Sequence, residues 1–423
     1  MGRFIGTNKK AAHVAALSGE DLSVQPSLVF DMDTYNSYKK ANLVGISGFG
    51  YFFGSTANPM TIQTLGADGQ PSYVPRSKTF SDMTNDPSVP WQIGDKLSQP
   101  IKIASTGILT SAGELWLWGD NTHGQLGQND TVNRSSPVQI DGTWIDFQAM
   151  VQSTIAIKSD GTLWSWGRNH DGRLGQGDTV SRSSPAQIGA LTNWTKVSGR
   201  GSIGAAMNSS GQIYCWGENG GFINNSVVSR SSPVQLSGAS VWTDCVVGGD
   251  FTGAVKNDGT LWAWGPASQA WVFPTNANRS SPVQIGTDTD WKYVFQNTEN
   301  VAFAMRTNGN LWGWGLNNNG GVGDTTTTSR SSPVQVAGMP AMDTSVDFIR
   351  KENLLYNGRS IKAIANTGAL YTWGWNVQQQ LYPYSTSDPT TSPVQVGSDT
   401  DWYGVVVYGS GTHFTVKQSA HVD

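Results

Sequence analysis

Residue patterns that could support catalysis or cofactor binding are few in this chain of 423 residues. The segment Gly199–Gly204 has the spacing of a dinucleotide-binding loop, but it joins two short strand-like stretches and no helix follows to offer backbone N–H donors. Neither a Gly-x-Ser-x-Gly nucleophile motif nor a phosphate-binding loop occurs in the sequence. We therefore predict a non-enzymatic protein that uses no cofactor.

Metal and redox chemistry are equally unsupported by the residue spacing. The five His residues are scattered, and the acidic turn residues lack the ligand order of a calcium loop, so we expect no metal site. Cys215 and Cys245 both lie in strand-like stretches, where a thiol serves as a small apolar side chain. Two cysteines are too few for a disulfide framework, and we predict no disulfide.

A short phrase that begins and ends with glycine recurs along the chain. It consists of Gly, four residues, an aromatic residue and Gly, and it is followed each time by a proline phrase. Most neighbouring copies lie roughly 50 residues apart, which is typical of propellers and other repeat arrays. The seven copies span residues 48–54, 113–119, 161–167, 211–217, 259–265, 309–315 and 368–374, and the prolines are Pro90, Pro137, Pro185, Pro233, Pro282, Pro333 and Pro393.

The copy at 159–167 shows how one unit folds. Asp160-Gly161 predicts a two-residue hairpin turn, because glycine adopts a positive φ without steric cost. Trp164 and Trp166 are two residues apart and therefore share one face of the strand that follows. Pro185 lacks a donor for the sheet and indicates an outer strand. Two more strands precede the turn, so each unit has four.

These units predict an all-β fold, namely a seven-bladed β-propeller of four-stranded antiparallel blades over residues 43–423, preceded by a non-repeat arm at residues 1–42. The chain enters at a third strand, residues 49–53, and leaves after first and second strands at residues 402–407 and 413–417. We therefore expect the N- and C-terminal strands to share and close one blade.

An arginine precedes the proline phrase in five units. Because a feature present in five copies is rarely an active site, we predict that these side chains form hydrogen bonds between blades and bind no ligand. The five residues are Arg134, Arg182, Arg230, Arg279 and Arg330.

The sequence resembles the regulator of chromosome condensation repeat, a family of seven-bladed propellers, over roughly residues 43–423. The resemblance rests on Gly124–Asp130 and Gly172–Asp178, together with the Leu-Trp-Ser-Trp-Gly and Arg-Ser-Ser-Pro-Val-Gln phrases. It implies the fold but transfers no site residue. The best-known member is a guanine nucleotide exchange factor that docks on nucleosomes, and this chain lacks the basic tails of that pattern.

Composition argues against two classes of partner. With 27 Lys and Arg against 31 Asp and Glu, the net charge of -4 offers no basic excess for phosphates, so we expect no nucleic acid partner. No apolar run approaches the roughly 20 residues of a membrane-spanning helix, and the first ten residues lack the apolar core of a signal peptide. We therefore expect no membrane association.

Segments that do not repeat are the predicted interaction sites. The connection from Gly54 to Pro90 is twice as long as that from Gly119 to Pro137, and residues 339–359 and 376–391 are also extended. In a four-stranded blade, the first-to-second and third-to-fourth connections share one rim, so all three extensions should lie on one face and the arm on the other. The candidate residues are Arg3, Phe4, Tyr35, Tyr38, Tyr73, Arg76, Phe80, Arg350, Lys351, Tyr356, Tyr382 and Tyr384.

Low charge, near-identical Arg-Ser-Ser-Pro-Val-Gln copies and the N-terminal Met-Gly-Arg-Phe-Ile-Gly-Thr-Asn resemble propellers of tailed-bacteriophage particles. The resemblance implies a structural virion protein of the tail or capsid, assembled in the host cytoplasm. Its arm would bind other virion proteins, and its loop face would contact a host surface protein or glycan. Two alternatives remain open: a cellular adaptor or exchange factor that binds a small GTPase, and a propeller lyase or glycan hydrolase with acids gathered at the channel mouth.

Overall fold

The computed structural model describes most of the repeat region. It divides the chain into two compact units, one of which contains both chain ends. The described residues are 49–50, 62–65, 71–74, 100–104, 106–218, 228–236, 240–247, 252–265, 279–295, 301–344, 354–357, 360–375, 389–398, 400, 402–408 and 412–417. One compact unit spans residues 100–400, and a second combines residues 1–99 with 401–423. Each unit is described by itself.

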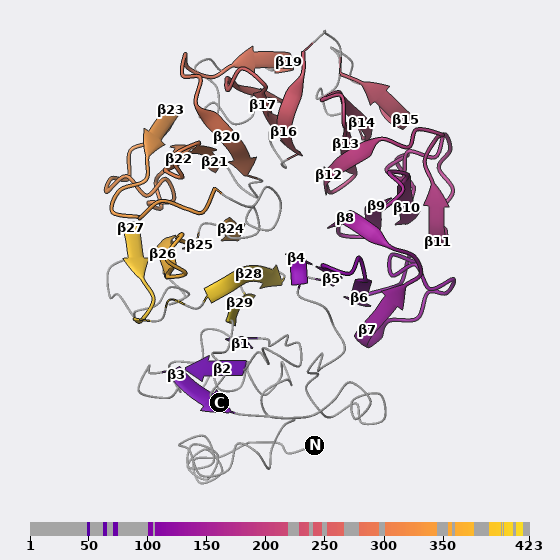
Figure 1. The fold of residues 1–423 in the computed structure, drawn as a ribbon, viewed down its shortest axis with the longest axis horizontal. Helices are drawn as coiled ribbons and strands as arrows, with labels where there is room; N and C mark the ends of the chain where they lie inside the picture. The colour runs from indigo at the N-terminus through magenta and orange to yellow at the C-terminus, as the bar shows by residue number, and fades with distance from the viewer. Residues whose placement is uncertain are drawn as a thin grey trace. The chain divides into compact units, whose positions relative to one another are not determined.

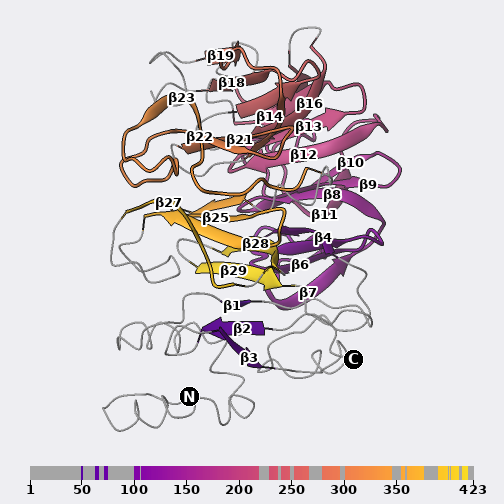
Figure 2. The same cartoon turned by 60° about the vertical axis from the view of Figure 1, so that its left-hand side comes forward.

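The unit of residues 100–400 consists of six four-stranded antiparallel sheets, here called blades 1 to 6 in chain order. Within each blade the strands follow one another as a meander, and Figures 1 and 2 show the blades succeeding one another with the first strands on the inner side. The absence of helices among the described residues and the four-stranded blades confirm the predicted fold class.

The strands of blades 1 to 3 are β4 (Pro100–Ala104), β5 (Gly107–Thr110), β6 (Leu115–Gly119), β7 (Arg134–Ile140); β8 (Trp144–Ala149), β9 (Ser153–Lys158), β10 (Leu163–Gly167), β11 (Arg182–Gln187); and β12 (Trp194–Arg200), β13 (Ile203–Asn208), β14 (Ile213–Gly217), β15 (Arg230–Gln235). Those of blades 4 to 6 are β16 (Trp242–Val247), β17 (Thr252–Lys256), β18 (Leu261–Gly265), β19 (Arg279–Gln284); β20 (Trp291–Phe295), β21 (Val301–Arg306), β22 (Leu311–Gly315), β23 (Arg330–Gln335); and β24 (Leu354–Asn357), β25 (Ser360–Ile364), β26 (Leu370–Gly374), β27 (Thr390–Gln395).

The terminal unit places the two ends of the chain in one sheet, as predicted. Its strands are β1 (Phe49–Gly50), β28 (Trp402–Tyr408) and β29 (Thr412–Lys417), in the order β1-β29-β28. The pairing of β1 with β29 is parallel, however, and not antiparallel as predicted. A short turn forces antiparallel pairing, and no such turn joins these two strands. The fourth strand predicted at Pro90 lies outside the described residues.

The long insert after Gly54 contains its own hairpin. Strands β2 (Ile62–Leu65) and β3 (Pro71–Val74) pair antiparallel with each other, and no other strand of the described residues joins them. The sequence predicted only a long connection here, because the alternation in so short a pair gives little signal.

The turn between β9 and β10 differs from the predicted two-residue hairpin. Gly161 donates its N–H to the carbonyl of Lys158 at 2.9 Å, and Lys158 donates to Thr162 O at 3.0 Å, so three residues form the turn. Asp160 accepts from the N–H of Thr162 at 3.0 Å, and only Gly161 takes a positive φ, of 77°. A Cβ on Gly161 would lie 2.1 Å from Thr192 O, so this glycine is also required by the neighbouring connection.

The apolar core lies between successive blades. The strand β10 buries Leu163, Ser165 and Trp166 and leaves Trp164 half-buried, although the alternation placed both tryptophans on one face. Trp166 packs with Leu109 and Leu117 of blade 1 in one cluster. The equivalent tryptophans of blades 3 to 6, Trp216, Trp264, Trp314 and Trp373, are also fully buried. Truncation of such a side chain costs about 3–5 kcal/mol, so these residues are the main apolar contacts between blades.

A buried ion pair joins the first strands of three successive blades. Lys102 of β4 lies 3.0 Å from Asp146 of β8, and the other carboxylate oxygen accepts the N–H of Val197 of β12 at 2.7 Å. Asp146 is completely buried, and burial raises the pKa of its carboxyl while Lys102 opposes that shift. Hydrogen bonds from three donors, Lys102, Phe147 N–H and Val197 N–H, offset the cost of burying this charge.

The arrangement recurs two blades further along. Lys196 of β12 lies 3.7 Å from Asp244 of β16, and Asp244 accepts the N–H of Val294 of β20 at 2.9 Å. Lys196, Asp146 and Asp244 each stand two positions after the tryptophan that opens their strand. This alternation of lysine and aspartate was not predicted, although an alignment of the repeats contains it.

We predict that Lys102→Met lowers the free energy of unfolding by about 3–5 kcal/mol, because it leaves the Asp146 carboxylate buried without its cation. The double variant Lys102→Met/Asp146→Asn should recover part of this loss, since a neutral amide oxygen can still accept the Val197 N–H. Urea unfolding of the three proteins measures the difference. Equal stability of Lys102→Met and the unsubstituted chain would contradict the structural role of the pair.

Candidate functional site

The residues that the sequence singled out for interaction are not tested by the described structure. Tyr73 lies in β3 and Tyr356 in β24, where the strand positions are described but not the side chains. The other candidates lie outside the described residues: Arg3, Phe4, Tyr35, Tyr38, Arg76, Phe80, Arg350, Lys351, Tyr382 and Tyr384. Their role in binding therefore stays a prediction.

The described part of the predicted loop face consists of the connections between third and fourth strands. We define the loop face as these connections together with the turns between first and second strands. In blades 2 and 3 the two kinds of connection meet directly, since Ser202 of the β12–β13 turn donates to Asp171 of the β10–β11 connection at 3.1 Å. Arg168 likewise donates to Gln152 of the β8–β9 turn at 2.6 Å. The shared rim that the topology predicted is thus confirmed for these blades.

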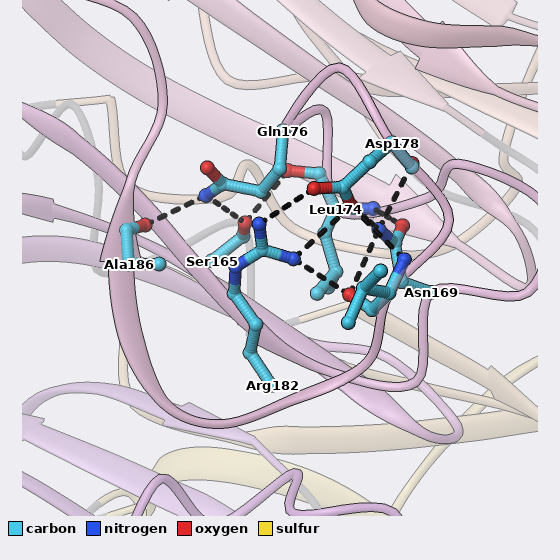
Figure 3. Close-up of polar contacts among 8 residues, drawn as sticks. Ser165, Asn169, Leu174, Gln176, Asp178, Arg182 and Ala186 are labelled. Atoms are coloured by element: carbon cyan, nitrogen blue, oxygen red, sulfur yellow. Dashed lines mark hydrogen bonds and ion pairs between the residues drawn. The ribbon is translucent and has the colours of Figure 1, made fainter.

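A buried asparagine organises the β10–β11 connection (Figure 3). The side-chain amide of Asn169 donates to the carbonyls of Asp178 and Val180 at 3.0 and 3.1 Å and to the carboxylate of Asp178 at 3.0 Å. Its carbonyl oxygen accepts the N–H of Leu174 at 2.9 Å. Asn169 is completely buried, so its polar atoms hold both ends of the loop together without competition from water.

An aspartate and an arginine complete the connection at its exposed end. Arg182 bonds both carboxylate oxygens of Asp178, at 2.8 and 3.1 Å, and also donates to Val180 O at 2.6 Å. Asp178 in turn accepts the N–H of Val180 at 2.9 Å. The hydrogen bonds from Arg182 and from the Val180 N–H lower the pKa of Asp178 to about 2. The tip residue Val180 therefore has both backbone groups fixed.

The same network recurs in blades 1 and 5. Asn121, Asp130 and Arg134 form it in the β6–β7 connection, and Asn317, Asp324 and Arg330 form it in the β22–β23 connection. The prediction that the repeated arginines bond between blades is therefore wrong for Arg134, Arg182 and Arg330. Each pairs with an aspartate of its own loop, because the loop folds back and brings residues four to six positions apart into contact.

Contacts between blades come instead from tryptophan and backbone groups of these loops. The indole N–H of Trp166 donates to Gln125 O in the preceding blade at 2.9 Å, and Trp216 donates to Arg173 O at 2.8 Å. Trp373 bonds Gly321 O at 3.0 Å in the same way. A backbone bond from Gly177 to Ser231 O, at 2.7 Å, ties the loop to the outer strand of the next blade. We call these contacts the latch.

Close packing at the latch explains one glycine of the repeat. A Cβ on Gly172 would lie 2.7 Å from the Cα of Ser231, closer than real contacts allow, and Gly172 has a φ of 71°. Gly124 meets Ser183 in the same way one blade earlier.

The connections at 219–227 and 266–278, after β14 and β18, lie outside the described residues.

One His-Asp-Ser group lies on the loop face, but its order does not fit nucleophilic catalysis. Asp171 is the central residue, bonded to His170 at 2.9 Å and to Ser202, so the histidine does not reach the serine as a base would. Hydrogen bonds from His170 and Arg173 lower the pKa of Asp171 to about 2. The group therefore acts as a polar link between blades 2 and 3.

Other chemistry has no counterpart in the described residues. They contain no cluster of three or more His, Cys, Asp or Glu side chains that could hold a metal ion. Within them, no helix is long and apolar enough to cross a bilayer. Cys215 and Cys245 are buried in one core cluster and no disulfide joins them. The carboxylate of Asp146, with its three donors, is fully engaged in the contact between blades.

Comparison with known proteins agrees with the propeller fold of four-stranded blades. The regulator of chromosome condensation (RCC1) repeat matches residues 112–156, 160–206 and 308–347. The crystal structure of Prp20p from Saccharomyces cerevisiae is 17% identical, covers 92% of this chain and 95% of its own, and gives a TM-score of 0.61. The crystal structure of yeast RCC1 (Prp20) bound to Kap60 is 16% identical in sequence, and the match covers 90% of this chain and 92% of the yeast chain. Its TM-score is 0.63.

Human WBSCR16 is 19% identical, covers 70% of this chain and 82% of its own, and gives a TM-score of 0.52. Among curated protein sequences no match is found. Identities this low show the fold alone. The fold is therefore that of an RCC1-type β-propeller.

The lowered pKa of Asp178 gives a pH-dependent prediction. Because the carboxyl titrates near 2 in the folded chain, against its usual value near 3.8, its stabilising contribution is fully present above pH 4 and is lost as the pH falls towards 2. Asp178→Asn should therefore be less stable than the unsubstituted chain at pH 5, and the difference should shrink at lower pH. Thermal unfolding at a series of pH values measures it.

Asp141→Asn, at an exposed acid of the β7–β8 connection, is the matched control and should change stability little at any of these pH values. A stability difference for Asp178→Asn that stays constant between pH 5 and 2 would show that the ion pair with Arg182 does not order the loop.

Proposed function

We propose that this chain is a non-enzymatic structural protein of a bacteriophage virion. In this role the propeller is a scaffold, the arm of residues 1–42 fastens it to other proteins of the tail or capsid, and the loop face contacts a host surface protein or glycan, or a second virion protein. Its site of action would be the virion, assembled in the host cytoplasm.

The observation that supports a binding role is that polar side chains hold the loops of the loop face in fixed conformations by hydrogen bonds. Asn169, Asp178 and Arg182 are engaged in holding the loop, and their counterparts in blades 1 and 5 do the same. These groups are thus part of the scaffold, and they fix the loop before any partner arrives. A surface that is already ordered loses less conformational entropy on binding, which suits a protein whose task is attachment.

The virion setting rests on sequence features. Charged residues make up only 14% of the chain, and Arg-Ser-Ser-Pro-Val-Gln recurs in near-identical copies, both of which resemble propellers of phage particles. The arm contains Lys9-Lys10 and the alanine-rich stretch 11–17, and its sequence lacks the repeat. These features make the arm the proposed anchor.

A cellular adaptor or exchange factor is the second candidate. It is favoured by the extent of the likeness to Prp20p, whose structure is described together with its binding to Gsp1p and histones. Release of bound guanine nucleotide from a small GTPase separates this candidate from the first. Acceleration by the purified chain would favour an exchange factor, and its absence would favour the virion role.

We predict that a variant lacking residues 1–42 still folds but no longer enters virus particles, because the anchor is lost while the repeats keep their own core. Particles purified from cells that express the full or the shortened chain are compared by mass spectrometry, and circular dichroism checks that the shortened chain is folded. Substitution of Lys9 and Lys10 by Ala within the full chain tests the arm without a large deletion. Normal incorporation of the shortened chain would refute the anchoring role.

A further inference from the structure

Pairs of aromatic rings recur on the rim opposite the loop face, and in blade 2 the chain places a cation over the pair. Trp144 opens β8 and Trp164 lies in β10, and their rings meet edge to face with centroids 6.5 Å apart. Lys158, the last residue of β9, holds its Nζ 3.9 Å from the ring centroid of Trp164 and 5.3 Å from that of Trp144. The ammonium is thus attracted by the electron-rich face of the Trp164 ring.

Blades 4 and 5 contain the same arrangement. The first residue of the first strand and the second residue of the third strand supply the rings, and the second-strand residue paired with the first ring supplies the cation. In blade 4 the Nζ of Lys256 lies 3.5 Å from the centroid of Trp262. In blade 5 the guanidinium carbon of Arg306 lies 4.0 Å from the centroid of Trp312. Three blades therefore cover the aromatic pair with a cation from one repeat position.

Blade 3 keeps the aromatic pair but not the cation. Trp194 opens β12 and Tyr214 is the second residue of β14, and their centroids lie 5.0 Å apart. The residue paired with Trp194 is Asn208. Its Oδ1 accepts the N–H groups of Ser210 and Gln212 at 3.1 and 3.0 Å, and its Nδ2 donates to Gln212 at 2.8 Å. Asn208 is thus engaged in its own turn, and no lysine or arginine of the described residues lies over the Tyr214 ring.

A buried oxygen without a partner lies at the same end of blade 3. The Oδ1 of Asn193, the residue before Trp194, is buried and accepts no hydrogen bond from the described residues. In blade 5 the corresponding residue is Asp290, whose carboxylate accepts from Arg306 Nη1 at 3.3 Å. Buried polar atoms are nearly always hydrogen-bonded, so this unpaired acceptor needs an explanation. A positively charged donor would satisfy the oxygen and the aromatic rings together.

We propose that Tyr214, Trp194 and Asn193 bind the ammonium group of a lysine side chain from a partner protein. The ammonium lies over the tyrosine ring and donates to Asn193 Oδ1. Lysine is the occupant that the molecule itself indicates, because lysines at the position of Asn208 cover the aromatic pair in blades 2 and 4. Tyr214 is only half-buried, so its ring is open to a side chain that approaches from outside.

The lysine site is independent of the proposed virion role. It lies at the β11–β12 and β13–β14 connections of blade 3, on the rim opposite the loop face, and it involves no residue of the arm. The purified full chain is sufficient to test it, without particles or host cells. Failure of the site leaves the incorporation experiment unaffected, and the reverse also holds.

Butylammonium chloride, which reproduces the end of a lysine side chain, is the probe for the site, and 1-butanol is its uncharged counterpart. NMR spectra of the full chain with isotope-labelled tyrosine follow the ring of Tyr214, whose signals are identified by their loss in Tyr214→Phe. We expect saturable shifts of these signals between about 1 and 100 mM butylammonium. Butanol should cause no saturable shift, because it lacks the charge that the ring attracts.

Asn208→Lys/Ser210→Asp rebuilds in blade 3 the arrangement of blade 2, where a lysine covers the rings and Asp160 accepts the N–H of Thr162 in the turn. The new lysine then occupies the site, so we expect the response of Tyr214 to butylammonium to be lost. Circular dichroism and the melting temperature verify that the variant is folded.

Ser209→Lys/Ser210→Asp is the matched control. Both serines are exposed, and the variant carries the same two charges in the same turn, with the lysine one position away from the paired residue. It should bind butylammonium with a dissociation constant within about twofold of that of the unsubstituted chain, because exposed charges are largely screened by salt.

Asn193→Asp copies the acid of blade 5 and tests the acceptor. It should lower the dissociation constant of butylammonium about threefold to tenfold, because a hydrogen bond to a charged acceptor is stronger. Equal affinity in this variant would contradict the role of Asn193.

The absence of a saturable shift of Tyr214 up to about 100 mM butylammonium would overturn the proposal. So would an equal response to butanol, because the rings would then be an apolar contact only. Unchanged binding in Asn208→Lys/Ser210→Asp would also overturn it, since the probe would then bind elsewhere.

Discussion

A hydrogen bond from the last tryptophan of a repeat to the loop of the preceding blade is the interaction on which the packing of blades 2, 3 and 6 against their preceding blades depends. The indole of Trp166 is fully buried between two blades, so its N–H has no water and needs an acceptor within the protein. Gln125 O provides that acceptor for Trp166, and Arg173 O provides it for Trp216. Because the acceptor belongs to a loop, the loop must adopt one conformation before the largest core side chain can be buried.

The Asn-Asp-Arg network holds the loop in that conformation. Within the loop, these three side chains therefore have a structural role, and the side chain at the tip is left for contacts with a partner. Asn169 closes the loop from inside, while Asp178 and Arg182 fix the backbone of the tip. With these groups engaged, the tip side chain is free to vary, as the valine of blade 2 and the threonine of blade 5 illustrate. A repeat of this kind can keep one scaffold and still differ from blade to blade in what it presents.

Local backbone conformation was predictable from the sequence, apart from the length of the β9–β10 turn, whereas contacts that need a folded loop or two packed blades were not. The glycine turn and the buried face of Trp166 follow from local conformation and alternation. The partner of Arg182 was predicted wrongly, because only the folded loop brings Asp178 to it. Lys102 and Asp146 were missed, since they are 44 residues apart and meet only when two blades pack. Candidates such as Tyr382 and Arg350 lie in connections that occur only once in the sequence, so no other repeat indicates their conformation.

Hydrogen–deuterium exchange of the full chain tests most directly whether the loops are structural parts of the blade contacts. The amides of Leu174 and Gly177 lie in a connection, yet they donate to Asn169 and to Ser231 of the next blade. If the loops are structural, these amides are protected nearly as well as those of strand β10, and they become exchangeable together with the strands. Rapid exchange at both amides while β10 remains protected would contradict it.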